Sequence, residues 1–160
     1  MIDEIDRKIA AIVQENARTS NTEIARQVGM APSATLERLR KLESQGIIRG
    51  YKAQINPKAA GLGLLAYAFI RANERVGVDN VGKELAAIPE VLEVHHIAGE
   101  DCYLVKIRTA NTEELGRLLR EKMGSIESVT STRTTIVLST IKETTDLPIG
   151  VPVQDDEQNP

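Results

Sequence analysis

Aromatic residues and cysteine are scarce in this 160-residue chain. It has no Trp, three Tyr, and a single Phe at Phe69. A sheet that stacks nucleic-acid bases on aromatic rings is therefore disfavoured. The one cysteine, Cys102, forms no internal disulfide and no multi-thiolate metal site, which favours a reducing cytoplasm. We expect neither a cofactor nor a metal.

Long apolar runs are also missing. The longest, residues 62–70, is interrupted by Gly63 and is far shorter than the roughly 20 residues that span a bilayer. No basic and apolar signal segment opens the chain at Met1. These absences predict a cytoplasmic protein without a membrane partner.

Charge is distributed unevenly along the chain. The net charge is −3, yet residues 1–63 hold 10 Lys and Arg against 7 Asp and Glu, whereas residues 64–160 hold 10 against 16. Residues 33–58 are the most basic part, with 6 basic and 2 acidic side chains. Because phosphate contacts supply most sequence-independent affinity for nucleic acid, this segment is where DNA contacts are expected.

Three helices are predicted in the first half. Apolar residues recur at helical spacing over about Asp3–Asn16, and Ser20 with Glu23 has the spacing of a capping box for a short second helix. Gly29 then allows a tight turn, and Pro32 suits the first position of a third helix that Gly46 closes. A short helix, a glycine-containing turn and a basic helix form the helix-turn-helix pattern.

The third helix is the predicted recognition helix. Its polar face carries the side chains expected in the DNA major groove: Ser33, Ala34, Glu37, Arg38 and Lys41. Residues 47–55 are strand-like and are interpreted as a wing or connecting strand, from which Arg49 and Lys52 contact phosphates. The pattern alone also allows a three-helix bundle whose basic face is only solvated.

The second half predicts a ferredoxin-like βαββαβ unit, so the whole chain is α+β. Strands are expected over 64–72, 91–98, 103–108 and 129–141, and helices over 80–88 and 112–123. Both helices then cover one face of an antiparallel sheet. The other face needs a partner, which predicts a homodimer formed sheet to sheet.

The chain resembles the Lrp/AsnC (leucine-responsive, feast/famine) family of transcription regulators. The resemblance rests on Asp6–Ile9, Asn21–Ala25, Pro32–Ala34, Leu42–Glu43 and Gly46–Tyr51, and it continues to about Glu143. It implies a DNA-binding regulator, controlled in assembly or DNA affinity by a small molecule, an amino acid. It also implies dimers that assemble into tetramers or octamers, and an imperfect palindrome is expected as the DNA site.

Two positions of the recognition helix depart from the family. Family members often carry Ser at Ala31 and a basic residue at Glu37. We hypothesise that Glu37 accepts a hydrogen bond from a cytosine amine. An ion pair with Lys41, four residues later, is the alternative.

The resemblance also places an amino-acid pocket at a glycine turn and the last strand. The candidate effector-binding residues are Gly99, Glu100, Asp101, Cys102, Tyr103, Thr132 and Thr134. The family commonly has an aromatic residue and then Asp where this chain has Asp101 and then Cys102. Alternatively, Glu100 and Asp101 only solvate a hairpin.

The expected domains follow from these patterns. They are a winged helix-turn-helix domain over 1–50, a connecting strand and hinge over 51–63, the oligomerisation and effector domain over 64–143, and an acidic tail over 144–160. The tail is expected to be flexible, shielding the DNA surface or aiding solubility. Two rival functions remain: a tetrapyrrole decarboxylase, disfavoured by only two His, and an amino-acid sensor that does not bind DNA.

Overall fold

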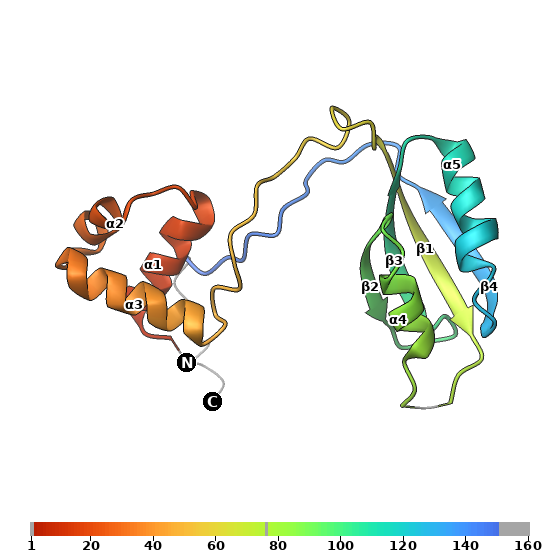
Figure 1. The fold of residues 1–160 in the computed structure, drawn as a ribbon, viewed down its shortest axis with the longest axis horizontal. Coiled ribbons are helices and arrows are strands. Elements are labelled where there is room, and N and C mark those ends of the chain that lie inside the picture. Colours follow the sequence, from red (N-terminus) through yellow and green to blue (C-terminus); the bar gives the residue numbers. More distant parts are fainter. Residues whose placement is uncertain (1, 76, 151–160) are drawn as a thin grey trace, which may run out of the picture. The chain divides into compact units, whose positions relative to one another are not determined.

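The computed structural model describes residues 2–75 and 77–150. The chain forms two compact units. One comprises the residues up to Ala53 together with the C-terminal residues from Lys142, and the other comprises Gln54–Ile141. Figure 1 shows helices alone in the first unit and a sheet with helices in the second.

The first unit contains three helices, α1 (Glu4–Glu15), α2 (Asn21–Val28) and α3 (Pro32–Ser44). Their apolar faces meet in one small core. Its fully buried members are Ile9, Val13, Ile24 and Leu42.

Local caps explain where these helices begin and end. The side chain of Asp3 accepts from the Asp6 N–H at the start of α1. Ser20 accepts from the Glu23 N–H at the start of α2, while the Glu23 carboxylate bonds to Arg26 and Gln27, so only one half of the expected capping box forms. Gly29 ends α2 with φ of 70°, a left-handed conformation that glycine adopts without strain. The helix-turn-helix is confirmed.

The expected wing strand does not form. No strand is assigned between Gly46 and Leu64, all of which lie within the described residues. An isolated extended segment needs a neighbouring strand to satisfy its backbone groups, and this chain supplies none there. The segment is therefore an extended connection.

The second unit has the strand order β2-β3-β1-β4, with every neighbouring pair antiparallel. This is the expected ferredoxin-like arrangement. Its elements are β1 (Leu64–Ala72), α4 (Asn80–Ala86), β2 (Val91–His96), β3 (Tyr103–Thr109), α5 (Thr112–Arg117), the π-helical turn η1 (Leu118–Met123) and β4 (Val129–Ile136).

Both helices of this unit pack on one face of the sheet. Ala68, Ile70 and Val105 from the strands are buried against Leu85 of α4 and Leu115 of α5. The opposite face carries Tyr67 and Phe69, and the Arg133 guanidinium lies 4.1 Å from the centre of the Phe69 ring. The helices thus form one layer on the sheet, and no element among the described residues covers its second face.

Two elements differ most from the expected boundaries. The helix expected over 112–123 changes to π-helical bonding at Leu118, and the Gly124 N–H bonds five residues back to the Leu119 carbonyl. The last strand ends at Ile136 instead of 141. Ile136 pairs with Ala66, the Val137 N–H still bonds to the Leu65 carbonyl, and β1 begins at Leu64, so β1 does not extend far enough to pair with the residues that follow.

Candidate nucleic-acid interface and ligand pocket

The exposed face of α3 is the candidate nucleic-acid interface. At about 100° per residue, Ser33, Glu37, Arg40 and Lys41 fall on one side of the helix, and all four are exposed. Arg40 was missed by the sequence analysis, although its position, seven residues after Ser33, places it on this face. The face therefore carries two cations, one carboxylate and one hydroxyl.

Arg38 lies on the flank of α3 and is held by α1. Its Nη1 donates to the Asp3 carboxylate at 2.6 Å and to the Asp6 carboxylate at 2.8 Å. Hydrogen bonds to Asp3 and Asp6 raise the pKa of Arg38. Asp6 is buried, so the guanidinium compensates a carboxylate in the core of the unit. Among the proposed DNA contacts, Arg38 therefore has a structural role inside the protein.

The amino-terminal turn of α3 has no side-chain cap. Ala31 occupies the cap position, and its carbonyl accepts from both the backbone N–H and the Oγ1 of Thr35. Thr35 is fully buried, and Ala34 is half-buried. The first N–H groups of the helix thus have no side-chain acceptor, an arrangement that suits an external anion.

Glu37 and Lys41 form no ion pair with each other. Neither side chain has a hydrogen-bond or ion-pair partner in the part of the chain that the structure describes. The intrahelical alternative considered for Glu37 is therefore not observed. Its carboxylate remains available at the surface of the recognition helix.

Arg49 and Lys52 lie on the connection that follows α3, and both are exposed. The Tyr51 hydroxyl between them donates to the Glu43 carboxylate at 2.7 Å. Burial and this bond raise the pKa of Tyr51 to about 12. The connection is therefore fastened to the end of α3, which keeps both cations beside the recognition helix.

The glycine turn of the candidate effector site joins β2 to β3. Gly99 has φ of 127°, which side-chain-bearing residues rarely adopt. Glu100 pairs with Arg71 at 2.9 Å, and Asp101 pairs with Arg133 at 3.1 Å. Both carboxylates therefore form ion pairs with arginines of the sheet, and these pairs hold the turn to β1 and β4.

The threonines of β4 lie away from Asp101. Thr132 pairs in register with Ile70 and Thr134 with Ala68, so both face the helix layer. Arg133, the partner of Asp101, points to the opposite face. Within one protomer, the structure thus brings Asp101 to β4 but separates it from both threonines.

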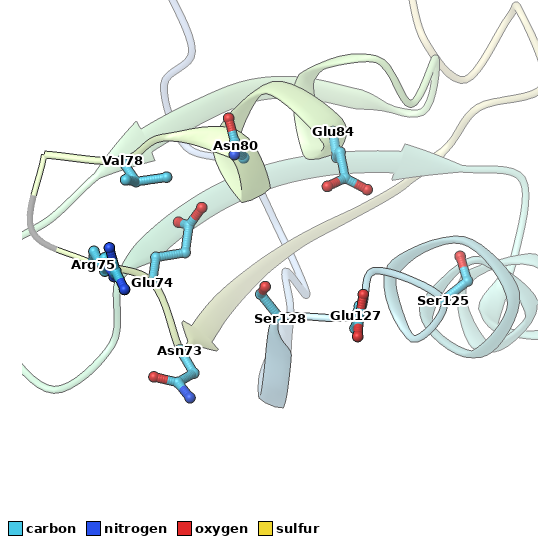
Figure 2. Close-up of a pocket in the computed structure, with 9 residues that line it drawn as sticks. All are labelled: Asn73, Glu74, Arg75, Val78, Asn80, Glu84, Ser125, Glu127 and Ser128. Carbon is cyan, nitrogen blue, oxygen red and sulfur yellow. The ribbon is translucent and has the colours of Figure 1, made fainter.

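A pocket of about 530 Å³ opens beside the glycine turn, at the end of the sheet where β1 ends and β4 begins. Figure 2 shows its lining residues on the loop after β1, on α4 and on the loop before β4. The lining is mostly polar and includes three carboxylates: Asn73, Glu74, Arg75, Val78, Asn80, Glu84, Ser125, Glu127 and Ser128. The sequence analysis did not identify this pocket, because its residues come from two loops and a helix that are separate in the sequence.

Glu74 connects the pocket to the predicted effector residues. Its carboxylate accepts from the Val81 N–H at 2.9 Å and from the Tyr103 hydroxyl at 2.8 Å. Burial and the bond to Glu74 raise the pKa of Tyr103 to about 12. A Cβ on Gly82 would lie 2.8 Å from the Tyr103 ring, so the ring fits closely against α4. Tyr103 is thus a buried residue that is hydrogen-bonded to the pocket residue Glu74.

Cys102 also fastens the turn to β1. Its N–H donates to the Ile70 carbonyl at 2.8 Å, and its Sγ donates to the Ala72 carbonyl at 3.3 Å. No group of three or more His, Cys, Asp and Glu side chains among residues 2–75 and 77–150 is arranged to hold a metal ion. In the same ranges, no helix is long and apolar enough to cross a membrane.

Two known domains match this chain. Residues 2–43 match the AsnC-type helix-turn-helix domain, and residues 65–147 match the Lrp/AsnC ligand binding domain. The division agrees with the two halves in which the interface and the pocket were found.

Similar proteins and solved structures cover nearly the whole chain. The HTH-type transcriptional regulator FL11 of Pyrococcus horikoshii is 42% identical over 92% of this chain and 97% of its own length. The leucine-responsive regulatory protein of Escherichia coli is 34% identical over 92% of both chains. The crystal structure of regulator NMB0573 from Neisseria meningitidis in complex with L-methionine has a TM-score of 0.85 at 32% identity, covering 93% of this chain and 97% of that one. The chain belongs to the Lrp/AsnC family of transcription regulators, with an AsnC-type helix-turn-helix domain and an Lrp/AsnC ligand-binding domain.

Proposed function

We propose that this regulator reads its DNA site with the exposed face of α3. The observation that carries the proposal is the set of unpaired polar groups on that face, where Lys41, Arg40 and Glu37 project from a helix whose first turn has no side-chain cap. Ser33 and the half-buried Ala34 lie at its amino-terminal end, where a recognition helix approaches base edges. Arg49 and Lys52 bind phosphates, and Arg38 positions the helix against α1.

A salt titration tests this proposal. Binding to the DNA upstream of the protein's own gene is measured between about 50 and 200 mM salt. A protein making several phosphate contacts loses affinity steeply over this range, and log Kd varies linearly with log salt concentration. Absence of sequence-specific retention at low salt would contradict the proposal and favour a sensor that acts without DNA.

Base selection tests the role of Glu37. If its carboxylate accepts from a cytosine amine, Glu37→Ala relaxes the preference at one base pair per half-site. Sites are selected from a randomised pool with the wild type and the variant. An unchanged sequence preference would remove Glu37 from base readout.

We propose further that two protomers associate through the sheet face that bears Tyr67 and Phe69. An antiparallel sheet with helices on one face commonly buries the other against a partner. Such a dimer holds two recognition helices at a fixed separation, so the site is an imperfect palindrome with half-sites about one helical turn or a multiple apart. Further assembly to tetramers or octamers follows from pairing of dimers.

The proposed effector is an amino acid bound at the end of the sheet, beside the glycine turn. A solved regulator of Mycobacterium tuberculosis with the same fold holds L-methionine, at 33% identity and a TM-score of 0.84. In this chain, backbone groups at Gly99 and the Asp101 carboxylate suit the charged α-groups of an amino acid, whereas Thr132 and Thr134 of the same chain face the helix layer, away from Asp101. Tyr103, which follows the turn, is held by the hydrogen bond from its hydroxyl to Glu74.

A thermal-shift screen against the twenty amino acids identifies the effector. A ligand that binds only the folded protein raises the melting temperature progressively as its concentration exceeds its Kd. No shift at millimolar concentration would leave a regulator that is controlled by its own concentration or assembly. The proposed role includes no catalytic step, and a protein that binds chromosomal DNA acts in the cytoplasm.

A further inference from the structure

The C-terminal segment 144–150 contacts the outer side of α1 within the first unit. The Gln14 side-chain amide makes two hydrogen bonds to the backbone of Leu147. Its Nε2 donates to the Leu147 carbonyl at 2.8 Å, and its Oε1 accepts from the Leu147 N–H at 2.9 Å. One amide thus satisfies both polar backbone groups of one residue.

A second contact lies one helical turn before Gln14. A Cβ on Gly150 would be 3.6 Å from the Ala11 Cβ, which is ordinary van der Waals distance. Ala11 and Gln14 are three residues apart and therefore neighbours on the surface of α1. Ile149, between the two contact points of the segment, is half-buried, whereas residues 142–148 are exposed.

Local hydrogen bonds shape the segment for this contact. The Asp146 N–H donates to the Thr144 hydroxyl at 3.0 Å, and the Ile149 N–H donates to the Leu147 carbonyl at 2.8 Å. Such bonds reduce the conformational freedom that docking would otherwise remove. The segment is therefore partly organised for binding.

We infer that α1 carries a docking site for the chain's own C-terminal segment, which acts as a strap on the DNA-binding unit. The site recognises the backbone of Leu147 through Gln14, and Gly150 lies against Ala11. Recognition of backbone groups explains how a segment whose Leu147 side chain is 64% exposed is still bound. The strap closes a loop from α1 through the entire second unit and back to α1.

Hydrogen exchange of the Leu147 amide tests the docking directly. An exposed segment exchanges at the intrinsic rate unless its N–H groups are bonded. In the full-length protein we expect the Leu147 amide to be protected roughly three- to tenfold, the range set by one net hydrogen bond. Gln14→Ala should abolish this protection.

The matched control is Glu15→Ala, on the same helix and also exposed. It should leave the Leu147 amide as protected as in the wild type. Equal exchange rates for Leu147 in the wild type and in Gln14→Ala would overturn the inference. Helical content by circular dichroism confirms that each variant is folded.

A cross-link tests whether the strap belongs to the same chain. Disulfides form at Cβ separations of about 3.5–4.5 Å, so Ala11→Cys with Gly150→Cys should oxidise readily in a Cys102→Ser background. A monomer band with altered mobility on a non-reducing gel is expected. A cross-linked dimer, or no cross-link, would contradict docking within one chain. Gln27→Cys with Gly150→Cys, which places the first cysteine on α2, is the control pair and should remain reduced.

Discussion

At the residue scale, two arginines of α3 have distinct environments. The sequence predicted a DNA contact for only one of them. Arg38 was predicted to contact DNA, but its guanidinium bonds to Asp3 and Asp6. Arg40 was not predicted, yet it is exposed beside Glu37. Helical periodicity predicts which side chains lie on the outer face of a helix. It does not predict which of them form hydrogen bonds to a neighbouring helix.

This contrast gives a prediction for the two arginines. Arg40→Ala should weaken DNA binding and leave the melting temperature unchanged. The slope of log Kd against log salt concentration should fall by about 1, the value expected for the loss of one phosphate contact. Arg38→Ala should instead lower the melting temperature, because the buried Asp6 carboxylate loses its partner. Thermal unfolding and salt-dependent binding of both variants check the two effects. A melting temperature for Arg38→Ala equal to that of the wild type would contradict the positioning role.

A second residue-scale prediction concerns Glu23. Hydrogen bonds from Arg26 and then Gln27 hold the pKa of Glu23 at about 2, below its ordinary value of 4.5. Because the folded state binds its proton more weakly than the unfolded state, Glu23 stabilises the helical unit above about pH 4.5, and this contribution is lost as the pH falls toward 2. In Glu23→Gln, the decline in thermal stability between these pH values should be shallower.

The control for this pH series is Glu15→Gln. Glu15 is exposed and pairs with no cation in the described part of the chain. Its variant should follow the wild-type acid profile. If Glu23→Gln also followed that profile, its carboxylate would make no net contribution to stability.

At the element scale, the sequence predicts the regular parts of the second unit well. Residues 64–72 alternate between the helix layer and the opposite face, and β1 has the predicted bounds. The π-helical turn is different, because residues 118–123 carry the same apolar spacing as an ordinary helix end. The wing strand predicted at residues 47–55 was wrong, since strand propensity says nothing about whether a partner strand exists.

The π-helical turn makes a prediction for two glycines. A Cβ on Gly124 would lie 2.6 Å from the Arg120 carbonyl oxygen, so Gly124→Ala should destabilise the unit by about 1–3 kcal/mol. At Gly116 the nearest atom is the flexible end of Arg120 at 3.2 Å, so Gly116→Ala should be neutral or stabilise by up to about 1 kcal/mol. Denaturant unfolding of both variants measures the difference. Equal effects would show that the backbone accommodates a side chain at Gly124.

At the scale of the whole molecule, the proposed dimer places Tyr67 in an interface. Tyr67 lies on the uncovered sheet face, paired in register with Lys106 on one side and Thr135 on the other. Tyr67→Lys should dissociate the dimer. The new ammonium would be buried in the interface beside that of Lys106, and the substitution adds no carboxylate to neutralise it. Sedimentation velocity measures the change. Glu113→Lys, on the exposed surface of α5, is the control and should remain dimeric.

Of the candidate effector site, the sequence predicts the glycine turn but not the neighbouring pocket. The turn that contains Gly99 is identifiable because its conformation demands glycine. The pocket is not, because Glu74 and Glu84 are far in sequence from Glu127, and the fold alone brings the loop after β1, α4 and the loop before β4 together. Strand register, which sequence does not reveal, decides that Thr132 faces the helix layer while Arg133 meets Asp101.

The division of the chain has a consequence for how such regulators diversify. The first unit contains both the residues before Gln54 and those after Ile141, so the second unit is, in connectivity, an insertion into the first. A module inserted between two points of a host can be exchanged without cutting the host's own core. A second unit with a new ligand specificity can therefore be transplanted between relatives at these two junctions. The helix-turn-helix and the C-terminal strap then stay together in the first unit.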